Sequence, residues 1–248
     1  MYEAQQKPSI VCGAYCVHQP DGIPSPSLRP AAVAHAGANL YMASYGFLPT
    51  PTVDYHRIVA CPERGQRIAA LWAAAPRADD SALAAYRAFR QETAEQFAFL
   101  TRPVADGGAG IRVERSSSDP YADAPAMIED LETHRRLRIL ATAGSGVSHP
   151  FLSDEENDQF RAVHDFFGHA SIGRGFDRHG EEAAWVKHSR MYTPLARLAL
   201  TSETRGQNAA FIWLHGGQRF PDQKAVLLPL AFTDPWRFSL RPHRADER

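Results

Sequence analysis

The residues with the clearest chemical potential are two histidines, His164 and His169, which lie five positions apart. A carboxylate, Glu203, follows on a later stretch whose apolar residues recur at helical spacing, so that its side chain is expected to face inward. Two neutral imidazoles and one carboxylate on one side of a cation suit mononuclear non-haem Fe(II) and leave coordination positions open. We therefore predict that His164, His169 and Glu203 bind one metal ion.

The start of the helix that carries the two histidines can be located in the sequence. Ser153 precedes three acidic residues, and Glu156 stands three positions after it, which is the pattern of a capping box. The helix should therefore begin near Asp154. On an unbroken helix, residues five apart differ by about 140° in direction, so we expect Gly168 to end the helix in an irregular conformation that brings His169 back toward His164.

Further acidic and basic side chains lie close to the predicted ligands. From about Glu181 the spacing predicts a helix whose inner face carries Glu181, Trp185 and His188. Glu181 and His188 are expected either to orient the ligands or to extend the site to two metals. Asp165, Glu182 and His188 are the candidate catalytic residues.

Two other interpretations fit the same residues. Zinc held by these ligands would keep a water of lowered pKa and act as a hydrolase, with Glu182, Asp165 or Glu181 as general base. A non-catalytic helical binding protein would use the histidines and the glutamate as a buried polar network, in which Glu203 pairs with an arginine. The abundance of aromatic residues around the histidines indicates a water-poor pocket, which favours oxygen chemistry over hydrolysis.

The segment His164-Asp165-Phe166-Phe167-Gly168-His169, followed by Glu203, resembles the iron site of the pterin-dependent aromatic amino acid hydroxylases. The resemblance covers residues 142–207. It implies a mainly helical catalytic domain in which His164, His169 and Glu203 hold Fe(II). It also implies activation of O2 for hydroxylation of a small aromatic or apolar substrate, with a reduced pterin as a candidate cofactor. The enzyme would then be a non-haem iron monooxygenase.

The scaffold is expected to be mainly α (α+β), a single catalytic domain spanning residues 1–248 with a few short strands. Prolines make residues 1–60 an irregular wrapping segment, residues 79–240 form the helical core, and residues 241–248 a loose tail. Patterning predicts helices at residues 79–100 and 124–135, from 154, from 181, and from Pro194 with Thr193 as its cap. Alternating or continuous apolar runs predict strands at residues 10–17, 111–114, 137–142 and 225–232.

Composition narrows the class of partner. The chain has 27 Lys and Arg against 28 Asp and Glu, so it carries no general basic surface for nucleic acid or an anionic membrane. No apolar run approaches the roughly 18 residues of a membrane span, and no secretory signal is evident, which predicts a cytoplasmic protein. Its 3 cysteines are expected to be free and reduced. A small-molecule substrate and O2 are the expected partners, and assembly into a homo-oligomer is left open.

Overall fold

The computed structural model describes residues 27–47, 53–144 and 148–241, which form a mainly helical single domain with a few short strands. The α-helices are α1 (Ala32–Ser44), α2 (Pro62–Ala74), α3 (Leu83–Thr101), α4 (Ala124–His134), α5 (Asp154–His164), α6 (Arg178–His188), α7 (Pro194–Thr201) and α8 (Gln207–Trp213). Two π-helical segments follow α5 and α7 directly, at Asp165–Ala170 and Ser202–Gly206. The strands are β1 (Ile58–Val59), β2 (Arg112–Ser116), β3 (Arg136–Leu140) and β4 (Ser239–Leu240).

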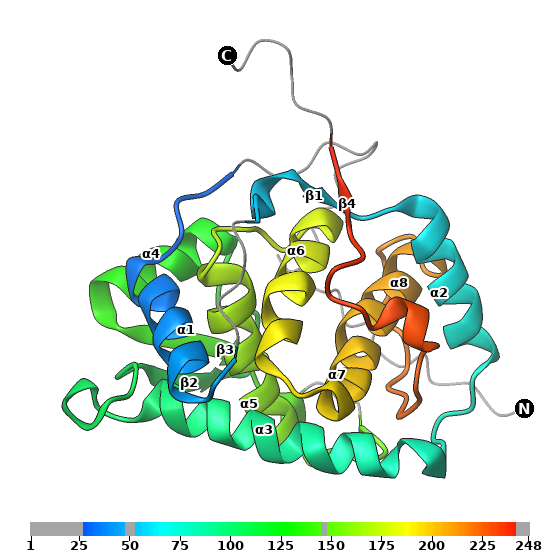
Figure 1. Cartoon of the computed structure of the whole chain (residues 1–248), viewed down its shortest axis with the longest axis horizontal. Coiled ribbons are helices and arrows are strands. Elements are labelled where there is room, and N and C mark those ends of the chain that lie inside the picture. Colours follow the sequence, from blue (N-terminus) through cyan, green and yellow to red (C-terminus); the bar gives the residue numbers. More distant parts are fainter. Residues whose placement is uncertain (1–26, 48–52, 145–147, 242–248) are drawn as a thin grey trace, which may run out of the picture.

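Helix α6 lies in the middle of the molecule, with α1 and α4 toward one end and α2 and α8 toward the other (Figure 1). The long helix α3 runs along one side and packs against α5 and α7. Aromatic rings fill the space between these helices, as in the contacts of Phe89 with Phe160 and Tyr192 at 5.0 and 5.6 Å between ring centroids. All nine residues of α6 from His179 to His188 other than Glu181 are buried, so this helix is the interior layer on which the others are assembled.

Two small sheets lie at the margins of the helical core. Strands β2 and β3 pair in parallel, with Arg112 opposite Arg136 and Ser116 opposite Leu140, and α4 provides the crossover that a parallel pair requires. Strands β1 and β4 pair antiparallel and bring the end of the described chain beside residues 58–59. None of the described helices is both long and apolar enough to cross a lipid bilayer.

Several local predictions are confirmed. The Ser153 side chain accepts from the Glu156 N–H, and the Glu156 carboxylate accepts from the Ser153 N–H, so the capping box forms. Thr193 caps α7 by accepting from Ala196. Helices α3 and α4 and strands β2 and β3 also lie where periodicity placed them, within a few residues.

Two local predictions are wrong. Residues 32–44 form α1 although the prolines around them predicted irregular structure, because Pro30 lies just before this Ala-rich helix and no proline lies within it. Residues 225–232 form no strand: apart from a bridge of Ala78 with Ala225, this run pairs with no strand in the described part of the chain. Val226, Leu228 and Phe232 of this run are instead buried against α2 and α8, and Pro229 lacks the N–H that a ladder needs. The predicted strand at residues 10–17, Cys12 and Cys16, and residues 242–248 of the tail lie outside the described residues, and Cys61 is a free thiol.

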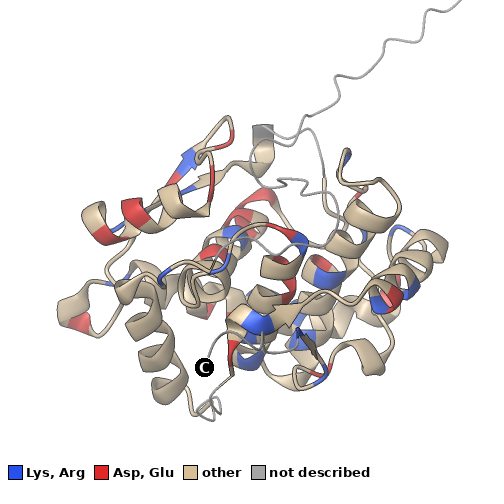
Figure 2. Cartoon of the chain, turned by 90° about the horizontal axis from the view of Figure 1, so that it is seen from above, with Lys and Arg blue, Asp and Glu red and all other residues tan. Residues whose placement is uncertain are grey.

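Acidic and basic residues are interspersed over the described elements (Figure 2), and some join neighbouring elements. The buried carboxylate of Asp130 on α4 receives hydrogen bonds from Tyr121 at 2.9 Å and Arg136 at 3.1 Å, which fixes α4 to β3. Burial alone would raise the pKa of Asp130, but Arg136 and Tyr121 hold it below its usual range. Some of the oppositely charged side chains are thus paired with one another within the domain.

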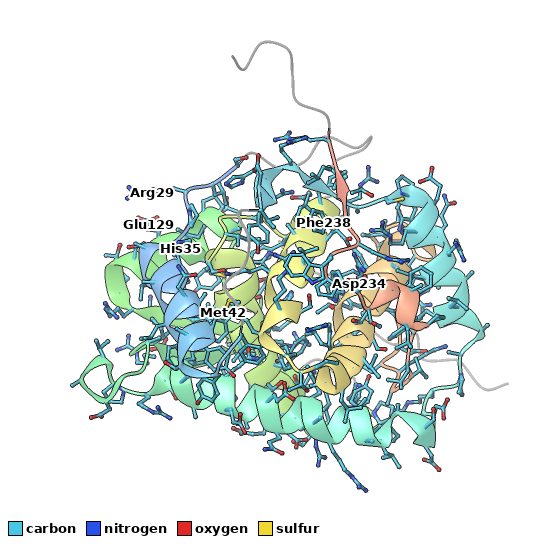
Figure 3. All side chains as sticks on the ribbon, viewed as in Figure 1. Arg29, His35, Met42, Glu129, Asp234 and Phe238 are labelled. Atoms are coloured by element: carbon cyan, nitrogen blue, oxygen red, sulfur yellow. The ribbon has the colours of Figure 1, made fainter. Side chains whose placement is uncertain are left out.

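Lys187 is a buried cation that has no carboxylate partner among the described residues. Its side chain is 5 % exposed, and its Nζ lies 4.0 Å from the sulfur of Met42, a residue of α1 that is labelled in Figure 3. Burial, with a smaller contribution from Arg190, lowers the pKa of Lys187 to about 8. Keeping this ammonium charged inside the domain therefore destabilises the folded state.

Replacing Lys187 with Met should stabilise the protein at pH 7. The folded-state pKa is depressed, so unfolding takes up protons between about pH 8 and the ordinary lysine value, and wild-type stability should gain over this window as pH rises. One pKa unit corresponds to about 1.4 kcal/mol, so the gain for Lys187→Met should be a few kcal/mol at most and should shrink above pH 8. Urea unfolding of both proteins from pH 7 to 10 measures it; a difference that is constant with pH would contradict the assignment.

Candidate metal centre

The π-helical segment Asp165–Ala170 brings the two predicted histidine ligands together. The Ser171 N–H donates to the Phe166 carbonyl at 3.1 Å, which is the i→i+5 bond of a π-turn. Residues five apart then stand one above the other, and the rings of His164 and His169 lie 5.1 Å apart between centroids. The prediction that Gly168 ends the helix is wrong, because the chain continues through it as a wider helix. The φ angle of Gly168 is not positive, so this glycine does not adopt a left-handed conformation.

Gly168 serves another purpose, which is close packing. A Cβ at this position would lie 3.1 Å from the Cβ of Ala184 on α6 and 3.3 Å from Nδ1 of His164. These separations are tighter than ordinary van der Waals contact, so the missing side chain allows α6 to approach the histidine turn. This approach brings the first turn of α6 to the two imidazoles.

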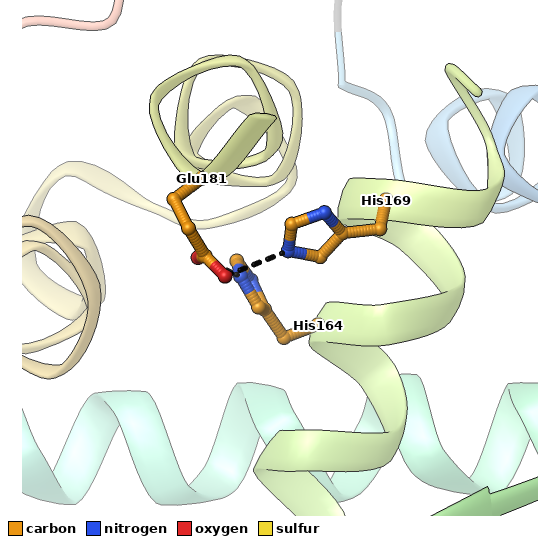
Figure 4. A group of neighbouring side chains, drawn as sticks. All are labelled: His164, His169 and Glu181. Atoms are coloured by element: carbon orange, nitrogen blue, oxygen red, sulfur yellow. Dashed lines mark ion pairs between the residues drawn. The ribbon is translucent and has the colours of Figure 1, made fainter. Parts of the chain in front are cut away.

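The side chain that α6 contributes is Glu181. Its Oε2 lies 3.6 Å from Nε2 of His164 and its Oε1 lies 3.5 Å from Nε2 of His169. The three side chains converge from two neighbouring helices (Figure 4), and one ligand atom from each lies within 4.8 Å of the others. His164, His169 and Glu181 therefore form a buried group that could hold a metal ion.

A chain of hydrogen bonds fixes the tautomer of His164. The Met191 carbonyl can only accept, so the Gln96 amide faces it with its NH2 group at 3.2 Å. The Gln96 Oε1 then accepts from Nε2–H of His188 at 2.7 Å, which leaves the Nδ1 of neutral His188 as an acceptor. His188 Nδ1 lies 3.2 Å from Nδ1 of His164, which must be the donor. The Nε2 lone pair of His164 is consequently the one presented to the site.

The other two members of the group are oriented in a similar way. Nδ1 of His169 donates to the Arg174 carbonyl at 3.3 Å, so its Nε2 also faces Glu181. Asn208 on α8 donates from Nδ2 to Oε2 of Glu181 at 2.9 Å and holds the carboxylate in place. Metal-ligating imidazoles generally donate their second N–H to such a partner, which selects the ligand nitrogen.

Electrostatics within the group are strongly coupled. Burial lowers the pKa of His164, whereas for His169 the opposing effect of burial is outweighed by Glu181 and Asp165, which raise its pKa. Burial would raise the pKa of Glu181, but the charge of His169 beside it holds that pKa well below its usual range. Burial also holds the pKa of His188 well below its ordinary value, in agreement with its role as a neutral acceptor. The carboxylate is ionised at neutral pH and attracts a positive charge to this point.

Glu203, the carboxylate predicted as the third ligand, is not part of this group. Its Oε1 accepts from the Tyr86 hydroxyl and from Nε2 of His149 at 3.0 Å, and its Oε2 accepts from Gln207 at 2.7 Å. Nδ1 of His149 accepts two backbone N–H groups, so Nε2 carries the proton that it donates to Glu203. The inward orientation was predicted, but three donors satisfy this carboxylate, and Glu181 rather than Glu203 joins the two histidines in the candidate group.

The predicted catalytic residues have other partners as well. His188 is buried between His164 and Gln96 and lies behind the ligand ring. Glu182 is held by Arg205 through two hydrogen bonds, one of them at 2.9 Å, and by Arg64 at 3.3 Å. Asp165 is 5 % exposed and acts on His169 through its charge. Within the described part of the chain, none of these three side chains forms a hydrogen bond with Nε2 of His164.

Two positioning residues, Gln96 and Asn208, were not predicted. Gln96 is fully buried and follows Phe89 and Thr93 on the inner face of α3. A polar residue on this otherwise buried face could have indicated a buried hydrogen bond. Asn208 lies beyond Glu203 in the chain, and nothing local in the sequence connects it to Glu181.

The donor set fits a divalent first-row metal ion. Within the described residues, Nε2 of His164 is buried and has no hydrogen-bond partner, which is costly unless a cation completes the group. Metal–ligand distances of about 2.0–2.2 Å require only a small contraction of three side chains that already converge. The remaining coordination positions would stay open for other ligands.

Comparison with known proteins gives no family assignment: no family model, no curated protein and no solved structure matches the chain significantly. No comparison links the mainly helical architecture to the hydroxylase fold.

Replacing Gln96 with Met should weaken metal binding without removing a ligand. His188 would lose its acceptor and could rotate its protonated nitrogen toward His164, so affinity for Zn²⁺ or Co²⁺ should fall by about 10–100-fold. Competition with a chromophoric chelator measures the affinity, and ¹⁵N chemical shifts of the histidines report the tautomer.

The matched control is Gln91→Met, an exposed position on the same helix that bonds only to Glu95 among the described residues. Equal affinity in the Gln96 and Gln91 variants would contradict the proposed chain of hydrogen bonds.

Proposed function

We propose that the protein is a mononuclear non-haem Fe(II) oxygenase that hydroxylates a small aromatic or apolar substrate. His164, His169 and Glu181 are the metal ligands in this proposal. The observation that carries it is the buried Nε2 of His164, which has no hydrogen-bond partner among the described residues, faces His169 and Glu181, and has its lone pair fixed by His188. Two imidazoles and one carboxylate are the ligand set associated with Fe(II) oxygenases.

In this proposal the iron supplies the activation of O2, and the protein supplies geometry and a dry environment. A tetrahydropterin is the proposed two-electron donor: substrate C–H, O2 and the tetrahydropterin yield substrate C–OH, water and a dihydropterin. His188 and Asn208 hold the ligands in orientation. The rings of Phe160 and Phe176, 5.7 and 5.0 Å from the two histidine rings between centroids, exclude water from the ligand cluster.

The partners of the nearby carboxylates favour an oxygenase over a zinc hydrolase. A hydrolase would need a general base that is free to accept a proton from a metal-bound water. Glu181 is assigned as a ligand, and Glu182 is bound by the guanidinium groups of Arg205 and Arg64. An ion-paired carboxylate is a poor base, since its ionised form is stabilised. The hydrolase is therefore the second candidate.

Metal analysis of glutamate variants tests the ligand set. The wild type, purified and reloaded anaerobically with Fe(II), should hold one iron per chain, and His164→Ala and Glu181→Gln should lose it. Glu203→Gln should keep the metal while losing about 1–3 kcal/mol of stability, because it disturbs the buried hydrogen bonds of Tyr86 and His149. Metal loss in Glu203→Gln with retention in Glu181→Gln would reverse the assignment, and stoichiometric zinc that iron cannot replace would support the hydrolase.

Oxygen consumption tests the reaction class. The iron-loaded wild type should consume O2 in the presence of an aromatic substrate and a tetrahydropterin, and Glu181→Gln should not exceed the pterin-only background. Product analysis should show one oxygen atom from ¹⁸O2 in the substrate. Hydrolysis of ester or amide probes by the zinc form, without oxygen uptake by the iron form, would contradict the oxygenase.

A further inference from the structure

Two successive residues of α8 hold the two inward glutamates. Gln207 donates from Nε2 to Oε2 of Glu203 at 2.7 Å. Asn208 donates from Nδ2 to Oε2 of Glu181 at 2.9 Å. An ionised carboxylate can only accept, so the NH2 group of each amide must face it. The first turn of α8 therefore sets the orientation of both carboxylates.

The two carboxylates differ in their second oxygen. Oε1 of Glu203 accepts from a tyrosine hydroxyl and a histidine N–H, so both of its oxygens are occupied. Oε1 of Glu181 has Nε2 of His169 at 3.5 Å, and apart from the two histidines no described residue donates to it. Asn208 thus occupies one oxygen of Glu181 and leaves the other to a metal ion.

Two further contacts fix the position of α8. Arg205, which precedes this helix, donates from Nε to Glu182 on α6 at 2.9 Å, so successive residues of α6 are tied to the same stretch of chain. Gly206 lies against α2, where an added Cβ would be only 2.7 Å from the ring of Trp72. The amide of Asn208 is therefore held at a set distance from its carboxylate.

The coordination mode of Glu181 decides how many positions of a bound ion stay open. A bidentate carboxylate brings both oxygens to the ion, whereas a monodentate carboxylate uses one. A carboxylate that is tied to α8 through Oε2 cannot turn both oxygens equally toward the histidines without lengthening the bond to Asn208. Hydrogen bonds to a ligating carboxylate orient it in this way.

We propose that Asn208 restricts Glu181 to coordination through Oε1 alone, so that the ion keeps one more open position than a bidentate glutamate would leave. In the proposed oxygenase, the additional position lets two small ligands from solution bind side by side. Asn208 is thus a positioning residue that controls access to the metal. This inference rests on the proposed function for the presence of a metal ion.

The test counts the water ligands of Mn²⁺, an octahedral ion, from the broadening of its EPR lines in water enriched in ¹⁷O. With one atom bound from each of the three ligands, wild type should retain about three waters, and Asn208→Leu should retain about two because Glu181 becomes bidentate. The second Glu181 oxygen should also keep the Mn²⁺ affinity of this variant within about tenfold of wild type. A merely structural role of Asn208 would lower the affinity without changing the number of waters.

Asn39→Leu is the matched control, because Asn39 is exposed on α1 and its side chain bonds to His35. It should keep the wild-type number of waters. Asn208→Ala serves the same purpose as Asn208→Leu should the leucine variant fail to fold. About two waters in wild type, or equal numbers in wild type and the Asn208 variant, would overturn the inference and leave the metal centre in place. Failure of folded wild type to bind Mn²⁺, Fe²⁺ or Zn²⁺ would remove the proposed function and the inference together.

Discussion

The approach of Glu181 to the imidazoles of His164 and His169 is the interaction on which the arrangement of this domain depends. Three ionisable groups in a helical interior carry a large desolvation cost, which is acceptable only when they compensate one another or share a cation. The structure meets this constraint with short separations of 3.5 and 3.6 Å and with fixed hydrogen-bond partners behind His164, His169 and Glu181. Helix α6, which supplies Glu181 and His188, lies in the middle of the molecule.

The two inward glutamates are handled in different ways. Glu203 is surrounded by neutral donors from Tyr86, His149 and Gln207, which satisfy its oxygens. Glu181 has one amide donor and two imidazole nitrogens, and among the described residues the His164 nitrogen has no hydrogen-bond partner. A saturated carboxylate stabilises the fold, whereas an unsaturated group of ligands is prepared for a cation. This difference is why the proposed centre includes Glu181.

Both regions use a π-helical turn directly after an α-helix. The first π-helical turn, at Asp165–Ala170, aligns residues that are five positions apart. The second, at Ser202–Gly206, contains Glu203. π-turns are rare in proteins as a whole. Those that occur are frequently found at functional sites, where they interrupt the regular repeat of a helix. Here the first turn converts a spacing that an α-helix would separate by about 140° into a shared face. Glu181, which lies beside this face, also lines a small pocket between α2, α6 and α8.

The sequence by itself determined the mainly helical class, the capping box at Ser153, the Thr193 cap and the paired histidines, because these are local patterns. It did not determine the conformation of Gly168, which depends on packing against α6. It also did not determine the helix at residues 32–44, where the flanking prolines indicated irregular structure. Only the tertiary structure decided that Glu181 joins the histidines. Both glutamates face inward from their own helices, and the choice depends on how closely α6 crosses the histidine turn, a distance set by the contact of Gly168 with Ala184.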